Sequence, residues 1–543
     1  MKIIDIRKLL MIVGVLSAFL LPSCLNDLDI RPIDPDIQIA EDVLTSEEAF
    51  QGALSKVYAG FALSGQQGPA GQGDLDGFDE GHSQYWRGYF VCQQLPTDET
   101  INGWADGNLP SMSQLNWDAS NEFIRSFYYR VIYQVSSANE FIRQVNDLGR
   151  DEFTRLPQYV AEARFLRALA YWHALDLFGN GVPFITEGSS VGSTNPPAAG
   201  DSPQGPELFN YIESELLAII GEGDETEQVL LEPGAGLVGQ ADKGAAWMLL
   251  AKLYLNHNTY LGTESNTYYE QARVYLNQLF EAGYSLQMED GSGLNAYELL
   301  FSAENFQYDN EIIFSFNYDG DSAQTFGGTT YIINASIGGA MIASDYGTSA
   351  NWGGNRTTSA FVNKFPETGD SRALFFTEGQ SLEILQQEQF TQGYAVTKFK
   401  NLNADGTPGI GANQGQSSVN VPVFRLADAY LMAAEIDLRL DGAVSAQNLA
   451  FVNEIQDRAG VPPLAVGDVT FDFIIDERAR ELYWECHRRT DLIRFGLFTG
   501  GDYIWPFKGG SPEGGSVPRF YDLMPIPQTD VNLNGNLEQN PGY

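Results

Sequence analysis

Residues that could catalyse a reaction occur in this sequence, but their contexts argue against an enzyme. The segment 188–192 matches the G-x-S-x-G pattern of a serine nucleophile, yet that nucleophile needs a helix directly after it, and Pro196 and Pro197 follow instead. The four histidines lie in no H-E-x-x-H context, which disfavours a zinc hydrolase. We therefore expect no catalytic residues. A glycoside hydrolase stays open as an alternative, because 71 acidic residues can bring two carboxylates together by chance.

Cofactor motifs are incomplete. Asn401, Asn403 and Asp405 copy the first half of an EF-hand calcium loop, but Ala412 stands at the twelfth position, where a bidentate Glu is needed. No complete G-x-G-x-x-G or Walker phosphate loop occurs. We expect no cofactor and no metal site from these motifs, and calcium elsewhere on so acidic a surface stays open.

The charge balance limits the partners. With 31 basic and 71 acidic residues, the chain lacks the cationic surface that nucleic acid or anionic headgroups require. A neutral ligand fits better. Cys92 and Cys486 are too few for a disulfide scaffold, and two separate core residues are favoured over a pair.

The N-terminus has the pattern of a bacterial lipoprotein signal. A basic start that includes Arg7 and Lys8 precedes the apolar stretch 9–21, which is too short to span a bilayer, and Ser23 precedes Cys24. We expect residues 1–23 to be a signal peptide and Cys24 to be lipidated, which would anchor the protein to a membrane.

One stretch has the composition of a binding surface. Residues 64–118 are rich in Gly, Gln, Asn and Asp and contain five aromatic residues outside any clear helical period: Tyr85, Trp86, Tyr89, Trp104 and Trp117. Sugars present C–H surfaces and hydroxyls, so their sites need aromatic planes beside amide and carboxylate groups. We expect Trp86 and Trp117 to be packing residues.

Helical periodicity dominates the elements that must position this stretch. It predicts helices over 122–146, 157–178, 207–220, 426–440 and 446–459, with a Gly/Ser/Pro-rich loop from Gly188 to Pro206. A modest strand signal covers 311–334, from Ile312 to Ile333.

A repeat signature refines the fold class. Trp247, Leu250, Ala251 and Tyr254 reproduce the first helix of a tetratricopeptide repeat, which predicts that Trp247 and Tyr254 are core residues. We expect a mainly α protein, a tetratricopeptide-like α-α superhelix with long loops and a minor β part.

Three blocks resemble the SusD/RagB family of outer-membrane lipoproteins. The segment 476–496 resembles its E-R-x-x-E-L…E-x-x-R-x-x-D-L-x-R-x-G hallmark, 524–543 resembles its P-I-P…Q-N-P-G-Y finish, and 162–183 resembles its A-E-x-R-F-L-R-A…L-F-G-x-V-P block. Cys486 departs from the family, which usually has Gly there. The arginines of the hallmark are expected to clamp neighbouring helices and loops.

The resemblance implies one domain over 24–543, with an N-terminal tetratricopeptide-like region over about 40–300 and a C-terminal SusD/RagB region over about 300–543. It implies a glycan-binding, non-enzymatic lipoprotein on the outer face of a Bacteroidetes-type outer membrane, partnered with a SusC-like TonB-dependent transporter. The alternative within the family is a RagB-like lipoprotein that captures peptides.

The resemblance also extends the candidate site. The segment 96–107 is similar to a family segment whose tryptophan and polar neighbours meet ligand, and 351–358 is similar to a second ligand-facing loop. We expect Trp104 and Trp352 to be stacking platforms. Their expected hydrogen-bonding partners are Asn102, Asp106, Asn351 and Arg356.

Overall fold

The computed structural model describes residues 39–68, 71–223, 228–366 and 369–543, so the predicted signal and Cys24 lie outside the described residues. The chain falls into two compact units, 1–50 and 51–543. The described part of the first unit holds helix α2 (Ala40–Val43) and the start of α3 (Glu47–Ala62). The predicted boundary between N-terminal and C-terminal regions near residue 300 stays a prediction.

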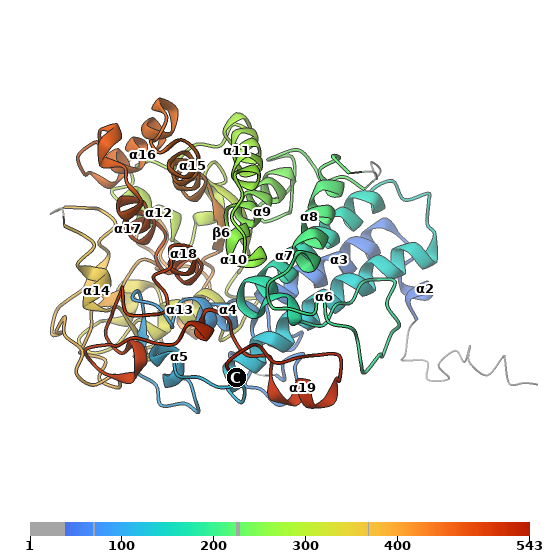
Figure 1. The fold of residues 1–543 in the computed structure, drawn as a ribbon, viewed down its shortest axis with the longest axis horizontal. Helices are drawn as coiled ribbons and strands as arrows, with labels where there is room; N and C mark the ends of the chain where they lie inside the picture. The colour runs from blue at the N-terminus through green and yellow to red at the C-terminus, as the bar shows by residue number, and fades with distance from the viewer. Residues whose placement is uncertain (1–38, 69–70, 224–227, 367–368) are drawn as a thin grey trace, which may run out of the picture. The chain divides into compact units, whose positions relative to one another are not determined.

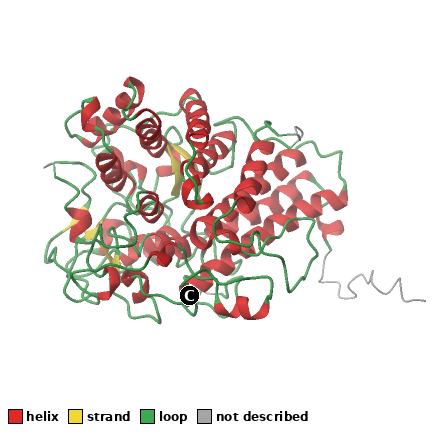
Figure 2. Ribbon diagram, in the orientation of Figure 1, coloured by secondary structure: helices red, strands yellow, loops and turns green. Residues whose placement is uncertain are grey.

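The second unit is mainly helical, and its strands are few and short (Figures 1 and 2). Its α-helices after α3 are α4 (Tyr85–Gln93), α5 (Pro110–Gln114), α6 (Glu122–Leu148), α7 (Leu156–Phe178), α8 (Pro206–Ile219), α9 (Lys243–Leu255), α10 (His257–Leu261), α11 (Asn266–Glu281), α12 (Ala296–Leu300), α13 (Gly328–Ala335), α14 (Ser359–Val362), α15 (Leu426–Asp441), α16 (Ala446–Ala459), α17 (Phe471–Leu482), α18 (Arg488–Arg494) and α19 (Gln528–Leu533). Its strands are β1 (Ile101–Asn102), β2 (Ile312–Phe316), β3 (Asn355–Arg356), β4 (Phe375–Phe376), β5 (Ala395–Val396) and β6 (Val421–Arg425).

The five long helices predicted from periodicity are confirmed, and they pack against helices that are near them in the chain. Helix α6 packs on α7, α9 on α11, and α15 on both α16 and α17. Local signals set the ends of α6: the side chain of Asn121 accepts hydrogen bonds from the amides of Phe123 and Ile124, and Gly149 ends the helix with φ of 54°. The predicted mainly α class is thereby confirmed.

Two sequence-based predictions about elements are wrong. Tyr331, Ile332 and Ile333 lie in helix α13, because a short buried apolar run has no periodicity that separates strand from helix. Strand β2 does form, and it pairs antiparallel with β6. Residues 85–93 form helix α4 within the stretch that appeared non-helical. All nine of its residues are buried, so it has no polar face to create a helical pattern.

The tetratricopeptide-like pair is confirmed with one change. Leu250, Ala251 and Tyr254 on α9 are buried, as are Ala272 and Leu276 on α11. Trp247, however, is only half-buried, so the prediction that it belongs to the core is wrong.

Buried ion pairs hold the C-terminal half together. Arg425 of β6 contacts Glu311, Glu481 and Glu485, with Nη1 2.6 Å from Glu481 Oε1. Arg458 of α16 places Nη2 2.6 Å from the same oxygen. Because isolated buried charges are costly, such a network is retained only when its members are paired.

The hallmark arginines clamp elements together, as predicted. Arg478 contacts Asp428 on α15 and Asp491 on α18, and Arg494 contacts Asp491 at 2.7 Å. Glu485 and Arg489 are four residues apart in the hallmark but have different partners, and Arg489 lies 3.5 Å from Asp176. Glu485 lies in the turn between α17 and α18, where it meets Arg425 instead.

The pH dependence of stability follows from a further clamp, in which Arg494 and Arg439 both contact Glu435. Burial acts to raise the pKa of Glu435, but Arg494 and Arg439 outweigh it and lower the pKa from 4.5 to about 2. The lowered folded-state pKa contributes stability above pH 4.5 that is lost as pH falls toward 2. We expect Glu435→Gln to flatten the acid limb of a plot of unfolding free energy against pH.

The measurement is urea unfolding between pH 2 and 7, with Glu270→Gln on an exposed position as the control. The clamp would have no electrostatic role if both variants retained the slope of the parent protein.

The remaining structural predictions concern cysteines and membrane spans. Cys92 and Cys486 are both buried and unpaired, as favoured from the sequence. Cys486 has φ of 66°, in the left-handed region, which explains why glycine suits this position. Among the described residues, no helix combines the length and the apolar character needed to cross a membrane.

Candidate functional site

A two-residue strand pair brings the two predicted ligand loops together. Strand β1 pairs antiparallel with β3, with Ile101 opposite Arg356 and Asn102 opposite Asn355. The ladder continues where the amide of Gly103 donates to the carbonyl of Gly354 at 2.9 Å. Trp104 follows β1 and Trp352 precedes β3, so both tryptophans emerge at the same end of this short ribbon.

Trp104 and Trp352 form one half-buried aromatic patch. Their ring centroids lie 6.4 Å apart with an interplanar angle of 53°. The indole nitrogen of Trp104 donates to the carbonyl of Trp352 at 3.2 Å, which fixes its ring. Gly354 permits this approach, because a Cβ there would lie only 2.5 Å from Trp104 Cε2. The two rings are therefore oriented before any ligand arrives.

The C-terminal end of α13 supports the Trp352 loop. The amides of Trp352, Gly353 and Gly354 donate to the carbonyls of Asn334, Ile337 and Ala335, at 3.0, 2.8 and 2.7 Å. The last carbonyls of a helix lack intrahelical partners, and here the loop supplies donors to two of its terminal residues. This explains how a segment without regular structure can hold an indole in place.

Arg356 does not have the position that the predicted contact with ligand requires. It is buried, and its guanidinium donates to the backbone carbonyls of Gly354, Gln387, Gln389 and Gln392 at 2.6–3.0 Å. Burial lowers its pKa to about 10. These contacts use its donors to hold loops together, so we replace the predicted ligand contact by a positioning role.

Asn102 is likewise buried, and we correct its predicted role in the same way. Its Nδ2 donates to Asn355 Oδ1 at 2.7 Å, and its Oδ1 accepts from the amide of Trp104 at 2.7 Å. The side chain thus shapes the turn that presents Trp104. Asp106 and Asn351, the other two predicted polar partners, are exposed in the same two loops.

Three further residues complete the patch, and no sequence pattern pointed to them. Arg87 of α4 lies over Tyr331 at 4.5 Å and over Trp104 at 5.8 Å, and it donates to the carbonyl of Phe326 at 3.0 Å. Phe326 is 38% exposed and lies 6.1 Å from the Trp352 ring. Tyr331 was not predicted as a site residue because its apolar run resembled a strand. Arg87 was not predicted because its helix, α4, was not recognised.

The family hallmark reaches this site through Asp98. Arg488 of α18 binds both carboxylate oxygens of Asp98 at 2.8 and 2.9 Å, three residues before β1. Burial raises the pKa of the adjacent Glu99 to about 8, and its carboxyl accepts from the amide of Trp484 at 3.2 Å. The C-terminal motif therefore anchors the base of the Trp104 loop.

These features define a mainly helical protein whose aromatic surface suits ligand binding by stacking. Comparison with known proteins gives the family. The chain is 34% identical to the starch-binding protein SusD of Bacteroides thetaiotaomicron, over 98% of each chain. The SusD family model matches residues 284–543. The chain belongs to the SusD family.

Solved structures share the fold. A SusD homologue from Bacteroides thetaiotaomicron has a TM-score of 0.70 at 19% identity, covering 93% of this chain and 98% of that one. A surface glycan-binding protein A from the same organism, in complex with laminarihexaose, has a TM-score of 0.66 at 19% identity, covering 91% of this chain and all of that one. The expected membership and fold class are confirmed.

Proposed function

We propose that this protein captures oligosaccharides or polysaccharides at the cell surface and delivers them to a SusC-like TonB-dependent transporter. The observation that carries the proposal is the preoriented pair of half-buried tryptophans, Trp104 and Trp352, with exposed Asp106 and Asn351 in the same loops. Aromatic faces bind the C–H surfaces of sugar rings, and carboxylate and amide groups bind their hydroxyls.

The relatives support a glucan as the first ligand class to test. The 34% identical relative is a starch-binding protein, and the solved neighbour at 19% identity binds laminarihexaose. Starch is an α-linked glucan and laminarin a β-linked one, so the pair spans both anomeric forms of glucose. Loop shape decides between them.

Two further parts of the proposal concern location. The pattern ending at Cys24 supports a lipid anchor in the outer membrane, with the protein facing the exterior. Family membership supports the transporter as partner. In this scheme the protein binds its ligand without cleaving it and passes it on.

Calorimetric titration of the soluble form, beginning after Cys24, tests the proposal. Maltohexaose, laminarihexaose and a mixture of peptides are titrated separately, and the mixtures are then analysed for cleavage products. We expect saturable heat from one of the two glucans and no product. Heat from the peptides alone would favour the RagB-like alternative, and release of shorter sugars would identify a glycoside hydrolase.

A further inference from the structure

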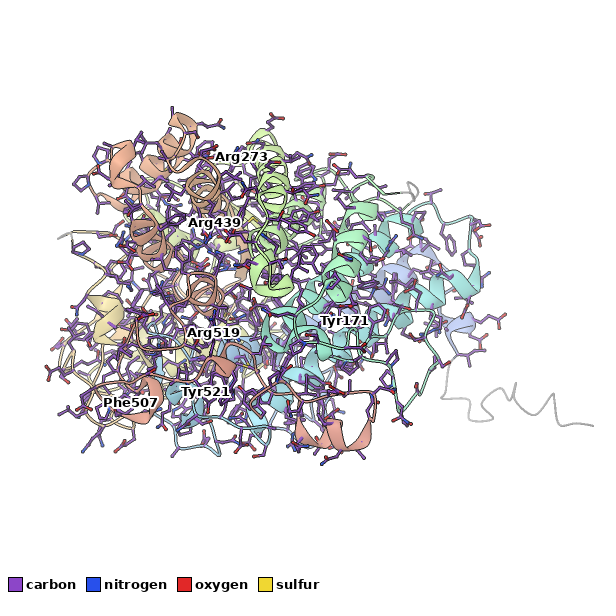
Figure 3. The ribbon with its side chains drawn as sticks, viewed as in Figure 1. Tyr171, Arg273, Arg439, Phe507, Arg519 and Tyr521 are labelled. Atoms are coloured by element: carbon purple, nitrogen blue, oxygen red, sulfur yellow. The ribbon has the colours of Figure 1, made fainter. Side chains whose placement is uncertain are left out.

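A cavity of about 790 Å³ lies apart from the tryptophan patch, and none of its lining residues belongs to that patch. It lies among the C-terminal end of α7, helices α10 and α18, the short 3₁₀ helix Arg519–Asp522 and the segment 540–541. Figure 3 labels Arg519, which lies below α18 in that view. A cavity of this size is in the range that holds small-molecule ligands.

The apolar part of the cavity is a fixed aromatic wall. Phe520 and Phe495 are both half-buried and line the cavity. The ring of Phe520 packs against Tyr521, with centroids 4.3 Å apart, and edge-on against Tyr543 at 5.0 Å. Because two aromatic neighbours hold it, Phe520 can stack on a ligand without first losing rotamer freedom.

The polar part offers charges of both signs. Arg519 extends into solvent with 90% of its side chain exposed, and its Nε lies 3.6 Å from Asp522 Oδ2. Asp522 Oδ1 accepts from Thr499 at 2.8 Å, and burial raises the pKa of this carboxyl. Asn258 and Gln204 add exposed amides at the rim. The second oxygen of Asp522 therefore faces the Arg519 guanidinium across a distance longer than an ordinary hydrogen bond.

This combination favours a neutral ligand that carries hydroxyls. An ion of either sign meets one attractive and one repulsive group in Arg519 and Asp522, and a hydrocarbon would bury both charges without partners. A hydroxyl can donate to the carboxylate and accept from the guanidinium. A sugar supplies several hydroxyls on one ring together with a C–H face for Phe520.

We propose that this cavity is a second carbohydrate-binding site, which holds a short segment of the same glucan class at Phe520 and between Arg519 and Asp522. The inference rests on the proposed function for its ligand class, but its residues are separate. Two sites on one chain raise the avidity for a polysaccharide long enough to reach both, relative to short oligosaccharides.

The test uses protein whose first site has been weakened by Trp104→Ala. Binding of maltohexaose and laminarihexaose is measured by saturation-transfer NMR and titration in this variant alone and combined with Arg519→Ala or Phe520→Ala. Val274→Ala, at an exposed position on α11, is the matched control. Arg519→Ala changes a 90% exposed side chain, so it tests the site even if Phe520→Ala does not fold.

We expect Trp104→Ala protein to retain weak glucan binding that falls at least tenfold with either cavity substitution and is unchanged by Val274→Ala. Absence of residual binding, or residual binding unaffected by both substitutions, would overturn the second site while leaving the first intact. In the opposite pattern, Trp104→Ala leaves binding unchanged, whereas Phe520→Ala and Arg519→Ala abolish it. That result would overturn the first site and support this one.

Discussion

Replacing Trp104 by Ala should weaken glucan binding about 30-fold, which corresponds to about 2 kcal/mol. Trp104 is half-buried, and its indole is held by the Trp352 carbonyl and by close contact with Gly354. Truncation removes a preoriented stacking surface, which is the kind of anchor that dominates binding energy. Titration calorimetry with the glucan that binds the parent protein measures the change.

A second tryptophan provides the control. Trp247 of α9 is also half-buried and does not belong to the patch, so Trp247→Ala should leave affinity unchanged. Trp104→Phe retains an aromatic face and should recover part of the loss. Thermal unfolding of each variant separates lost binding from lost folding. Unchanged affinity in a folded Trp104→Ala protein would remove this residue from the site.

The largest expected effect on stability is that of Glu481→Gln. Glu481 is fully buried, its Oε1 lies 2.6 Å from nitrogens of both Arg425 and Arg458, and its Oε2 accepts from Tyr297 at 2.8 Å. The substitution keeps the volume but removes one of the two carboxylate charges that Arg425 and Arg458 share, and Glu311 is the one that stays. We expect a loss of about 3 kcal/mol in the free energy of unfolding.

Urea unfolding at pH 7 measures this loss. Glu281→Gln at the exposed end of α11 is the control, and it should change stability by less than about 0.5 kcal/mol. Equal unfolding midpoints for the two variants would show that the buried network contributes no more than a surface charge.

Periodicity predicted helices such as α6 and α16 because each of them has one face buried and one exposed. Helix α6 shows this, since its predicted start at residue 122 is confirmed and its end differs by two residues. Helix α4 was missed because it is short and all nine of its residues are buried, which removes the polar face. Helices α7 and α15 are also buried along most of their length, but they are long enough for apolar residues at three- and four-residue spacing to show.

The candidate site was predicted in outline. Composition and family resemblance pointed to Trp104 and Trp352, and the structure places their rings together, although contact with a ligand stays a prediction. Asn102 and Arg356 lie in the same ribbon but are buried. Local sequence cannot distinguish a side chain that faces a ligand from one that binds backbone carbonyls, because both require polar groups beside a turn.

Long-range contacts explain why the other residues of the site could not be predicted from the sequence. Arg87 reaches Trp104 from a helix that precedes it, and Phe326 approaches Trp352 from a loop before α13. Arg488 fixes the base of the Trp104 loop from a position almost 400 residues away in the chain, through Asp98. Such pairings depend on the packing of α4, α13 and α18, which no local pattern encodes.

The most direct test of the central claim is a crystal structure of the protein with a bound oligosaccharide, obtained with maltohexaose or laminarihexaose according to which one binds. We predict sugar rings in contact with the Trp104 and Trp352 faces, with hydroxyls within hydrogen-bond reach of Asp106 or Asn351. A saturated complex in which both tryptophans remain free of sugar would contradict the assignment of this patch as the capture site.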